Sequence, residues 1–181
     1  MPRLLKLDDG DRPIFPEDAW TLVEAADTAV ADLPAGDLIV PLALWQRDAD
    51  ALRARSGAGS AVGVWLDAHE EAETLATDLQ GVALVALNFP NFADGRNLSN
   101  AVLLRTRHGW QGELRAIGDV HRDLLAAMRR CGIDAFALNE DLDPEAAAAA
   151  LRVMSDHYQG DVREPRPAFL RVERPTALPS L

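Results

Sequence analysis

The sequence is poor in the residues that build covalent or metal centres. Cys131 is the only cysteine in 181 residues, so one chain can form neither an internal disulfide nor an iron–sulfur cluster held by four thiolates. The four histidines, at positions 69, 108, 121 and 157, show none of the spacings that are typical of zinc sites. We therefore expect no metal centre, and the scarcity of cysteine is typical of a reducing compartment such as the cytoplasm.

Long apolar segments are missing as well. The longest, such as Val82–Leu87, are far shorter than the roughly 20 residues that a membrane-spanning helix needs. The N-terminal segment Met1–Asp11 has neither an apolar secretory core nor the arginine-rich, acid-free character of a transit peptide. We expect a cytoplasmic protein that does not associate with membranes.

Three common nucleotide-binding or catalytic motifs are absent. The sequence has no G-x-G-x-x-G after a strand, no G-x-x-x-x-G-K-[ST] and no G-x-S-x-G. This argues against a dinucleotide-binding Rossmann enzyme, a P-loop nucleotidase and an α/β hydrolase. No cofactor is predicted, but flavin binding has no compact motif, so a bound flavin or nicotinamide stays open as an alternative.

Negative charge dominates the chain as a whole, with a net charge of −11, which disfavours nucleic acid and anionic lipid as partners. Between Asp94 and Gly132, by contrast, seven arginines and four acidic residues give a local net charge of +3. Lys6 is the only lysine, and guanidinium groups bind oxyanions with two parallel hydrogen bonds. The arginine-rich segment predicts a site for a small oxyanion or a phosphorylated ligand.

Short apolar or β-branched runs alternate with amphipathic stretches from Asp37 onward, a pattern typical of strand–helix units around a mainly parallel sheet. We prefer a doubly wound open sheet, because about five strands are too few to close an eight-stranded barrel. A partial barrel of strand–helix units is the alternative. The pattern thus predicts an α/β fold with strands at Leu38–Pro41, Ala61–Leu66, Val82–Leu87, Glu113–Ile117 and Ala135–Leu138.

A single domain is expected over residues 1–160, since this length is near the usual size of one domain. Its first part, residues 1–33, is expected to contain a hairpin around Asp9-Gly10 and a helix in the alanine-rich stretch Trp20–Leu33. Strand–helix repeats then fill residues 37–160.

Residues 161–181 form a separate, proline-rich segment that contains Pro165, Pro167, Pro175 and Pro179. Because proline disrupts helices, we expect an extended tail without helix. Such a tail packs on the domain or on a neighbouring subunit, so a homo-oligomer is one possible assembly.

Polar residues follow the predicted strands where each strand ends. The carboxyl ends of parallel strands meet at one edge of the sheet, and ligands of α/β proteins bind there. The candidates at this edge are Asp67, Asn88, the loop Asp94-Gly95-Arg96, Asp119 and Asn139. Asp94, Arg96 and Asp119 are the candidate catalytic residues. The alternatives are a turn with a surface salt bridge at Asp94 and Arg96, and a helix N-cap at Asp119.

The arginines supply most of the candidate binding residues. Arg115 lies inside a predicted strand, where the alternative to anion binding is a structural pair with Glu113. Arg105 and Arg122 lie in predicted helices, where charged side chains usually face solvent. The full set of candidate ligand-binding residues is Asn88, Gly95, Arg96, Ser99, Arg105, Arg115 and Arg122.

Several sequence blocks resemble an uncharacterised bacterial family: Phe89-Pro90-Asn91-Phe92-Ala93-Asp94-Gly95-Arg96-Asn97-Leu98-Ser99, Leu103-Leu104-Arg105, Gly112-Glu113-Leu114-Arg115-Ala116-Ile117-Gly118-Asp119-Val120 and Arg130-Cys131-Gly132. Members of this family are commonly labelled probable oxidoreductases involved in sulfite reduction. Their genes tend to lie beside those for sulfite reductase and phosphoadenylylsulfate reductase. The resemblance implies a role in sulfur assimilation and favours a functional role for Asp94, Arg96, Arg115 and Asp119.

Three functions are compatible with the residues and the resemblance. The first is an accessory protein of assimilatory sulfite or sulfate reduction with an arginine-lined oxyanion or phosphate site. The second is an oxidoreductase of that pathway with a non-covalently bound flavin or nicotinamide. The third is a non-catalytic scaffold that docks on sulfite reductase or its electron donor. No catalytic motif decides whether the protein is an enzyme.

Overall fold

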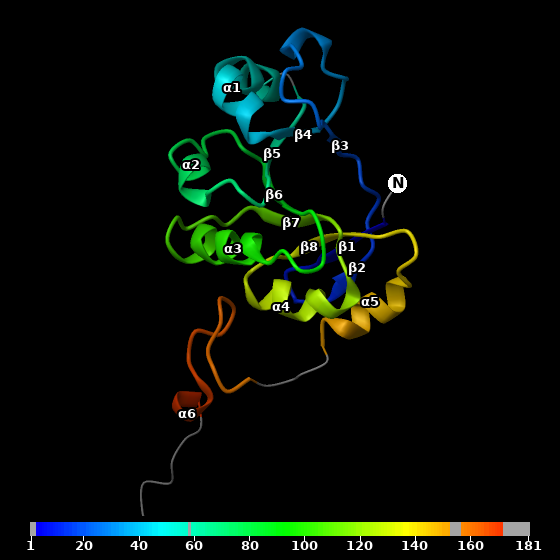
Figure 1. Cartoon of the computed structure of the whole chain (residues 1–181), viewed down its shortest axis with the longest axis vertical. Coiled ribbons are helices and arrows are strands. Elements are labelled where there is room, and N and C mark those ends of the chain that lie inside the picture. The colour runs from blue at the N-terminus through cyan, green and yellow to red at the C-terminus, as the bar shows by residue number, and fades with distance from the viewer. Residues whose placement is uncertain (1–2, 58, 153–156, 172–181) are drawn as a thin grey trace, which may run out of the picture.

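The computed structural model describes residues 3–57, 59–152 and 157–171 (Figure 1). A parallel sheet forms the centre of an α/β fold. Each of its central strands overlaps a strand predicted from the sequence, with boundaries that differ by no more than two residues. These strands are β4 (Leu38–Pro41), β5 (Val62–Leu66), β6 (Leu84–Phe89), β7 (Glu113–Gly118) and β8 (Ala135–Leu138).

Helices connect or follow these strands, as the alternating sequence pattern predicts. They are α1 (Leu42–Gly57), α2 (Ala72–Ala76), α3 (Arg96–Thr106), α4 (Leu125–Arg130) and α5 (Pro144–Ala150). Helix α5 begins with a clear local signal: the Asp143 side chain accepts a hydrogen bond of 2.9 Å from the Ala146 N–H, and Pro144 occupies the first turn.

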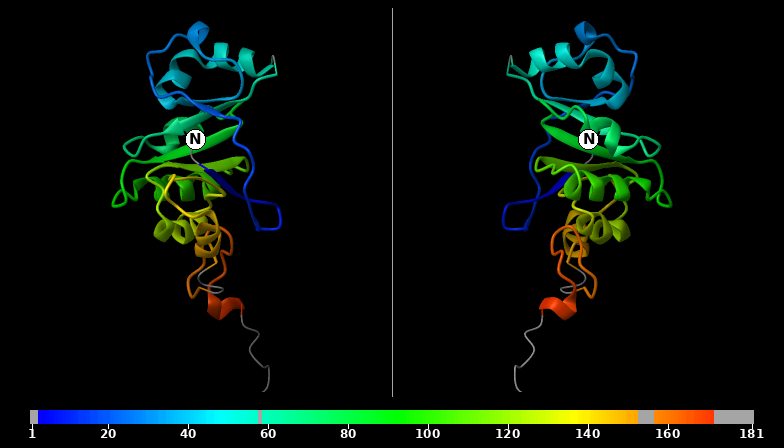
Figure 2. Two further views of the ribbon diagram at one scale, coloured as in Figure 1. Left: turned by 90° about the vertical axis from the view of Figure 1, so that its right-hand side faces the viewer. Right: turned by 90° about the vertical axis from the view of Figure 1, so that its left-hand side faces the viewer.

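The parallel strands follow one another across the sheet in sequence order, from β4 to β8. Right-handed crossovers that all run in one direction place their helices on the same face of the sheet. The sheet curls into an open half-barrel with the helices outside (Figure 2). The preferred doubly wound arrangement is therefore wrong, because it needs a reversal of strand order, and strand order is not encoded in strand spacing. The alternative, a partial barrel, describes the sheet.

The two faces of the sheet bury clusters of different size. The outer face and the helices share a large core that includes Trp45, Phe89 and Phe136. The inner face of the curl carries only a small cluster, against which Trp20 and Trp65 pack; its members are Ile39, Leu84, Ala86, Ile117 and Ala137. No helix among the described residues contributes to this second cluster, which Trp20 and Trp65 cover in part.

The N-terminal part of the chain extends the sheet beyond the five predicted strands. The hairpin expected around Asp9-Gly10 is formed by β1 (Arg3–Leu7) and β2 (Pro13–Ile14), which pair antiparallel. Strand β1 also pairs antiparallel with β8. At the other edge, β3 (Thr21–Leu22) pairs parallel with β4. The result is a mixed, eight-stranded sheet in the order β2-β1-β8-β7-β6-β5-β4-β3.

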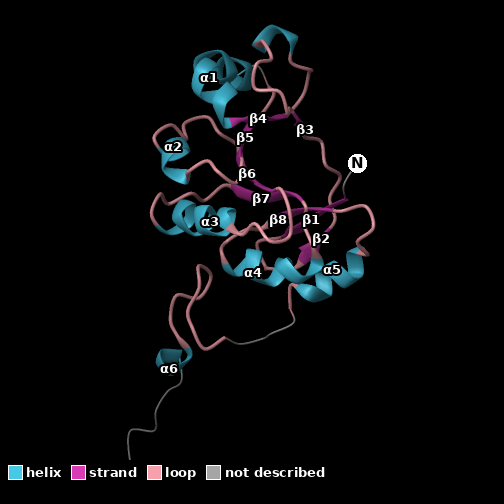
Figure 3. Ribbon diagram, in the orientation of Figure 1, coloured by secondary structure: helices cyan, strands magenta, loops and turns pink. Residues whose placement is uncertain are grey.

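The helix expected over Trp20–Leu33 is not formed. Thr21 and Val23 donate backbone hydrogen bonds to Asp37 and Ile39 instead, and only a 3-10 turn at Val30–Asp32 is helical (Figure 3). The open edge of β4 offers the Thr21–Val23 backbone partners, and this tertiary pairing outweighs the helix propensity of the alanines.

The expectation of a tail without helix also needs correction. Pro167 precedes α6 (Ala168–Arg171), a single turn in which the Leu170 N–H donates to the Pro167 carbonyl at 2.9 Å. Proline fixes its own φ near the helical value and is tolerated at the start of a helix, so it begins this turn. The part of the predicted tail over residues 172–181 lies outside the described residues.

Within the residues that the structure describes, no helix combines the length and the apolar character needed to cross a membrane.

Candidate functional site

Polar side chains form a band across the carboxyl ends of β5 to β8. Asn88 Nδ2 donates to Asp67 Oδ1 at 3.0 Å, which joins the ends of β5 and β6. Asn139 Nδ2 donates to Asp119 Oδ1 at 3.1 Å, which joins the ends of β7 and β8. All four are strand-end residues that the sequence pattern selects, and the structure brings them together at one edge of the sheet.

A histidine contacts each aspartate of this band. His69 Nδ1 lies 3.0 Å from Asp67 Oδ2, and His121 Nε2 lies 2.9 Å from Asp119 Oδ1. An aspartate beside an imidazole orients the ring. The band thus contains two similar His–Asp–Asn arrangements.

The loops that follow β6 and β7 touch at this band. The Phe92 N–H donates to the Asp119 carboxylate, and the Phe92 and His121 rings meet edge to face at 5.3 Å between centroids. Hydrogen bonds from Asn139, then His121, lower the pKa of Asp119, with a further contribution from Phe92. Asp119 is therefore ionised at neutral pH. It caps no helix, because its carboxylate is used between the loops.

Gly118 allows these loops to approach closely. Its φ is +86°, a value that favours glycine. A Cβ atom at this position would lie 2.4 Å from Asn88 Oδ1 and 2.5 Å from the Phe89 carbonyl oxygen. The absence of a side chain at Gly118 is therefore a requirement of the band.

Two buried asparagines hold the start of α3 against the strand ends. Asn97 Nδ2 donates to the Asn88 carbonyl oxygen at 2.7 Å, and Asn100 Nδ2 donates to Asn97 Oδ1 at 2.7 Å. Asn100 Oδ1 accepts from the Ala72 N–H at 3.1 Å. These side chains position Asn88. Sequence reasoning missed their role, although both follow directly after the loop that it singled out.

A groove of about 360 Å³ lies on the inner face of the half-barrel next to the band. Its apolar walls come from the segment around β3 and from the inner faces of β4, β7 and β8, and polar groups lie at its floor and mouth. The lining residues are Asp18, Trp20, Thr21, Leu22, Ile39, Arg115, Ile117, Gly118, Ala137 and Asn139. Gly118 and Asn139 therefore belong to both the groove and the strand-end edge.

Arg115 forms the buried end of this groove, with a side chain that is 2% exposed. Its Nη1 lies 3.0 and 2.9 Å from the two carboxylate oxygens of Asp18, and its Nε donates to Glu113 at 2.7 Å. Lys6 Nζ donates to the other oxygen of Glu113 at 2.7 Å. Arg115 and Lys6 thus neutralise the carboxylates of Asp18 and Glu113. The contacts of Arg115 match the alternative stated for it, a structural pair with Glu113.

The Asp94–Arg96 loop is a salt-bridged turn. Arg96 donates two side-chain hydrogen bonds to Asp94, at 3.0 and 2.6 Å, and the Arg96 N–H donates to the same carboxylate. These bonds lower the pKa of Asp94. Gly95 precedes α3, and Ser99 lies exposed on that helix. The loop therefore matches the alternative of a turn with a surface salt bridge, in which Asp94 and Arg96 bind each other.

Arg105 lies at the opposite end of α3 and serves packing. Its guanidinium donates to the carbonyl oxygens of Trp110, Gly112 and Gly132, at 2.8 to 2.9 Å, and to Asp134 at 2.7 Å. Burial lowers the pKa of Arg105. The structure does not bring Arg105 to the strand-end band, so it is separate from the other candidates.

Arg122 is the least engaged of the candidate arginines. It is 58% exposed and makes a single contact of 3.4 Å with Asp123. It lines a second hollow, of about 330 Å³, together with His121 and Asn139. Asp123, Asp141 and Asp143 also line this hollow. The candidate arginines thus do not converge on one pocket, and Arg122 is the one that lines the hollow beside the band.

No local sequence pattern marks Asp18 and Trp20 as site residues, because Asp18 precedes and Trp20 begins a stretch that resembles a helix. Their placement depends on β3 joining the sheet edge and on Arg115, which is far away in the sequence. Cys131 is partly buried beside the main core, and burial raises the pKa of its thiol. Among the described residues, no cluster of three histidine, cysteine or acidic side chains is arranged to bind a metal ion.

Comparison with known proteins places most of the chain in one family. No curated protein matches the sequence. Residues 63–169, which include β5 to β8 and the whole strand-end band, match the family described as "Bacterial protein of unknown function (DUF934)". The matched segment covers more than half of the chain, so the protein belongs to the DUF934 family.

Proposed function

We propose that the protein is an accessory component of assimilatory sulfite or sulfate reduction, and that it binds a nucleotide-like ligand in the inner groove. The groove supports this proposal most directly, since its apolar walls and its volume of about 360 Å³ suit a flat ring. Trp20 and Ile117 both line this groove. The pathway itself is suggested by the family resemblance.

The polar end of such a ligand belongs at the strand-end band. Asn139 lines both the groove and the neighbouring hollow, so a ligand that extends past Asn139 reaches His121 and Arg122. Three carboxylates share this hollow, and a phosphate or sulfate group is therefore expected on its Arg122 side. A ring joined to an oxyanion fits both parts better than an inorganic oxyanion does.

Ligand-induced thermal stabilisation tests this proposal. Suitable probes are adenosine 3′,5′-bisphosphate, FMN and NADPH, with sodium sulfite and sodium sulfate as oxyanions that lack a ring. At least one of the ring-containing probes is expected to raise the melting temperature at concentrations where the inorganic salts do not. Equal shifts from sulfate alone, or no shift from any ring-containing probe, contradict the proposal.

A matched pair of alanine substitutions locates the ligand. Ala137→Leu adds bulk inside the groove, whereas Ala127→Leu makes the same chemical change at an exposed position of α4. Ala137→Leu is expected to abolish the thermal shift, while Ala127→Leu retains it. An unchanged shift in the Ala137 variant places the ligand elsewhere.

An oxidoreductase is the second candidate, because the same groove suits the ring of a flavin or a nicotinamide. The His121–Asp119 pair then offers a group that can donate or accept a proton at the ligand. Visible absorbance of the purified protein, or a flavin released on denaturation, separates this candidate from a non-redox binding protein.

A further inference from the structure

An arm formed by residues 157–171 carries an exposed apolar tip. Tyr158, Phe169 and Leu170 are 72%, 52% and 62% exposed. The tip is folded, because the Ala168 N–H donates to the Tyr158 carbonyl at 2.8 Å and the Tyr158 and Phe169 rings lie 6.3 Å apart. Exposed apolar clusters of this kind commonly mark interaction surfaces.

The base of the arm is fixed to the body of the protein. Arg130 Nε donates to Asp161 at 3.1 Å, and the Val162 N–H donates to the Arg130 carbonyl at 3.2 Å. Arg163 forms an ion pair with Asp11 in the turn between β1 and β2. Figures 1 and 2 show α6 beyond the helical layer, away from the sheet. These contacts hold the tip out from the body.

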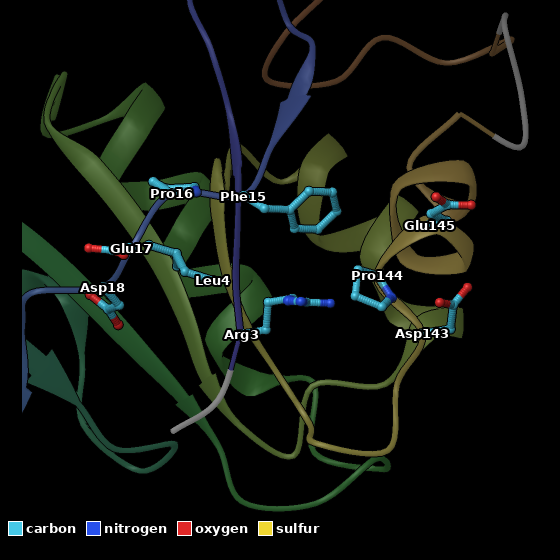
Figure 4. A pocket seen from close by; sticks show the side chains of 9 residues that line it. All are labelled: Arg3, Leu4, Phe15, Pro16, Glu17, Asp18, Asp143, Pro144 and Glu145. Carbon is cyan, nitrogen blue, oxygen red and sulfur yellow. The ribbon is translucent and has the colours of Figure 1, made fainter.

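A hollow that suits such a tip lies between the N-terminal hairpin and the start of α5 (Figure 4). Its volume is about 610 Å³. Leu4, Phe15, Pro16 and Pro144 give it apolar walls, and Phe15 is 43% exposed. Figure 4 shows the Phe15 ring and the Arg3 side chain pointing into the space in front of Pro144.

The charges of the arm and the hollow are opposite. The arm contains Arg163, Arg166 and Arg171 against Asp161 and Glu164, a net charge of +1 in a chain whose total is −11. The hollow has one basic residue, Arg3, against the carboxylates of Glu17, Asp143 and Glu145, while its fourth carboxylate, Asp18, is already paired with Arg115. Such complementarity favours association and fixes its orientation.

We propose that the arm tip of one copy docks in the hairpin–α5 hollow of a second copy. Phe169 and Leu170 fill the apolar part of the hollow, and Arg166, which is 66% exposed and already binds Glu164 within its own arm, lies beside Glu17 and Glu145. When each copy offers its arm to the other, the two contacts are related by twofold symmetry and close a dimer. This contact is inferred independently of the ligand proposed for the inner groove, although Asp18 lines both the groove and the hollow.

The mass of the full-length protein in solution, measured by sedimentation or by light scattering, tests the contact. It is compared between the unaltered protein, a variant of the arm tip and a variant of the hollow. The unaltered protein is expected at twice the mass of one chain. Phe169→Asp combined with Leu170→Asp removes the apolar tip, and Phe15→Asp alters the hollow; each change is expected to give monomers. Phe92→Asp is the matched control, because Phe92 is also 52% exposed but lies at the strand-end band, and it leaves the dimer intact.

Mixing the two defective variants gives the sharpest result. The Phe15 variant retains a normal arm and the Phe169/Leu170 variant retains a normal hollow, so a mixed dimer regains one of the two contacts. Native mass spectrometry is expected to show this mixed species, although each variant alone is monomeric. Arg166→Glu is expected to raise the dimer dissociation constant roughly tenfold, and circular dichroism verifies that every variant is folded.

Three results overturn the proposal. The first is an unaltered protein that stays monomeric at all concentrations. The second is a dimer that survives loss of the arm tip, and the third is a mixture of the two defective variants that forms no mixed species.

Discussion

Asp119 and Asn139 join the ends of β7 and β8 through a hydrogen bond of 3.1 Å between Asn139 Nδ2 and Asp119 Oδ1. This bond is the first cause of the lowered pKa of Asp119. A carboxyl group whose pKa is lowered by folding stabilises the native state above its unfolded pKa, and this contribution is lost as the pH falls. The stability that ionised Asp119 contributes to the native state is therefore lost in acid.

Asn139→Asp is expected to reverse the effect of residue 139 on the pKa of Asp119. Two carboxylates would then face each other, the pKa of Asp119 would rise, and the variant would lose stability at pH 7 but recover part of it near pH 4. Urea unfolding at both pH values measures the effect. Asn91→Asp is the control, because the Asn91 side chain only accepts a bond, from the Ala93 N–H, and a carboxylate can replace it. If both variants show the same change in the free energy of unfolding at both pH values, the contact between residue 139 and Asp119 does not contribute to stability.

Gly118→Ala is expected to disrupt the band. The new methyl group would overlap Asn88 Oδ1 and the Phe89 carbonyl at a positive φ, so we expect a loss of more than about 3 kcal/mol in the free energy of unfolding. Gly36→Ala is matched in backbone geometry, with a φ of +95° and no atom within 4 Å of the added carbon. It is expected to cost only about 1 kcal/mol. Chemical denaturation compares the two, and similar losses would argue against the close approach at Gly118.

Arg105→Ala is expected to destabilise the fold by about 3–5 kcal/mol, since it leaves the Asp134 carboxylate without its charged partner. Burial raises the pKa of Asp134. A carboxyl group with a raised pKa favours folding in acid and opposes it as the pH rises, so the loss is expected to be larger at pH 7 than at pH 4.5. Arg107→Ala is the control, because the Arg107 side chain is 66% exposed and pairs of this kind contribute about 0–1 kcal/mol. A loss independent of pH would argue against this account.

Arg115→Met is expected to release the segment that covers the inner face. Asp18, which is 19% exposed, would lose its charged partner, and Glu113, which is 13% exposed, would keep only Lys6, a cost of about 3–5 kcal/mol. Hydrogen exchange of residues 15–23 is expected to accelerate. Adding Asp18→Asn to the same chain removes one unpaired charge and is expected to restore part of the stability.

Arg12→Met provides the comparison for Arg115. Arg12 also pairs with an aspartate, Asp8, but its side chain is 76% exposed. It should leave exchange over residues 15–23 unchanged. If both variants protect this segment equally, the Arg115–Asp18 pair does not anchor it.

The parallel strands and the strand-end residues were predictable from sequence because both depend on local patterns. Apolar runs mark β4 to β8, and the polar residues that follow them must lie at one edge of a parallel sheet. This reasoning placed Asp67, Asn88, Asp119 and Asn139 correctly. It needed no knowledge of the order of the strands.

Features that depend on distant partners were not predictable. Strand order separates a half-barrel from a doubly wound sheet, and the spacing of strands is the same in both. Arg115 contacts Asp18, 97 positions away, and the residues between Trp20 and Leu33 form no helix because the edge of β4 competes for their backbone. An arginine-rich segment likewise does not reveal which carboxylates will neutralise it.

The pairing of β1 with β8 sets the order in which the chain can be completed. Arg3 lies opposite Leu138 in this pair, so β1 leaves the ribosome long before the strand with which it pairs. Until β8 has been synthesised, β1 and β2 form only an isolated hairpin, and such hairpins are marginally stable in water. The N-terminal residues are therefore added to a sheet that the later strands have already built.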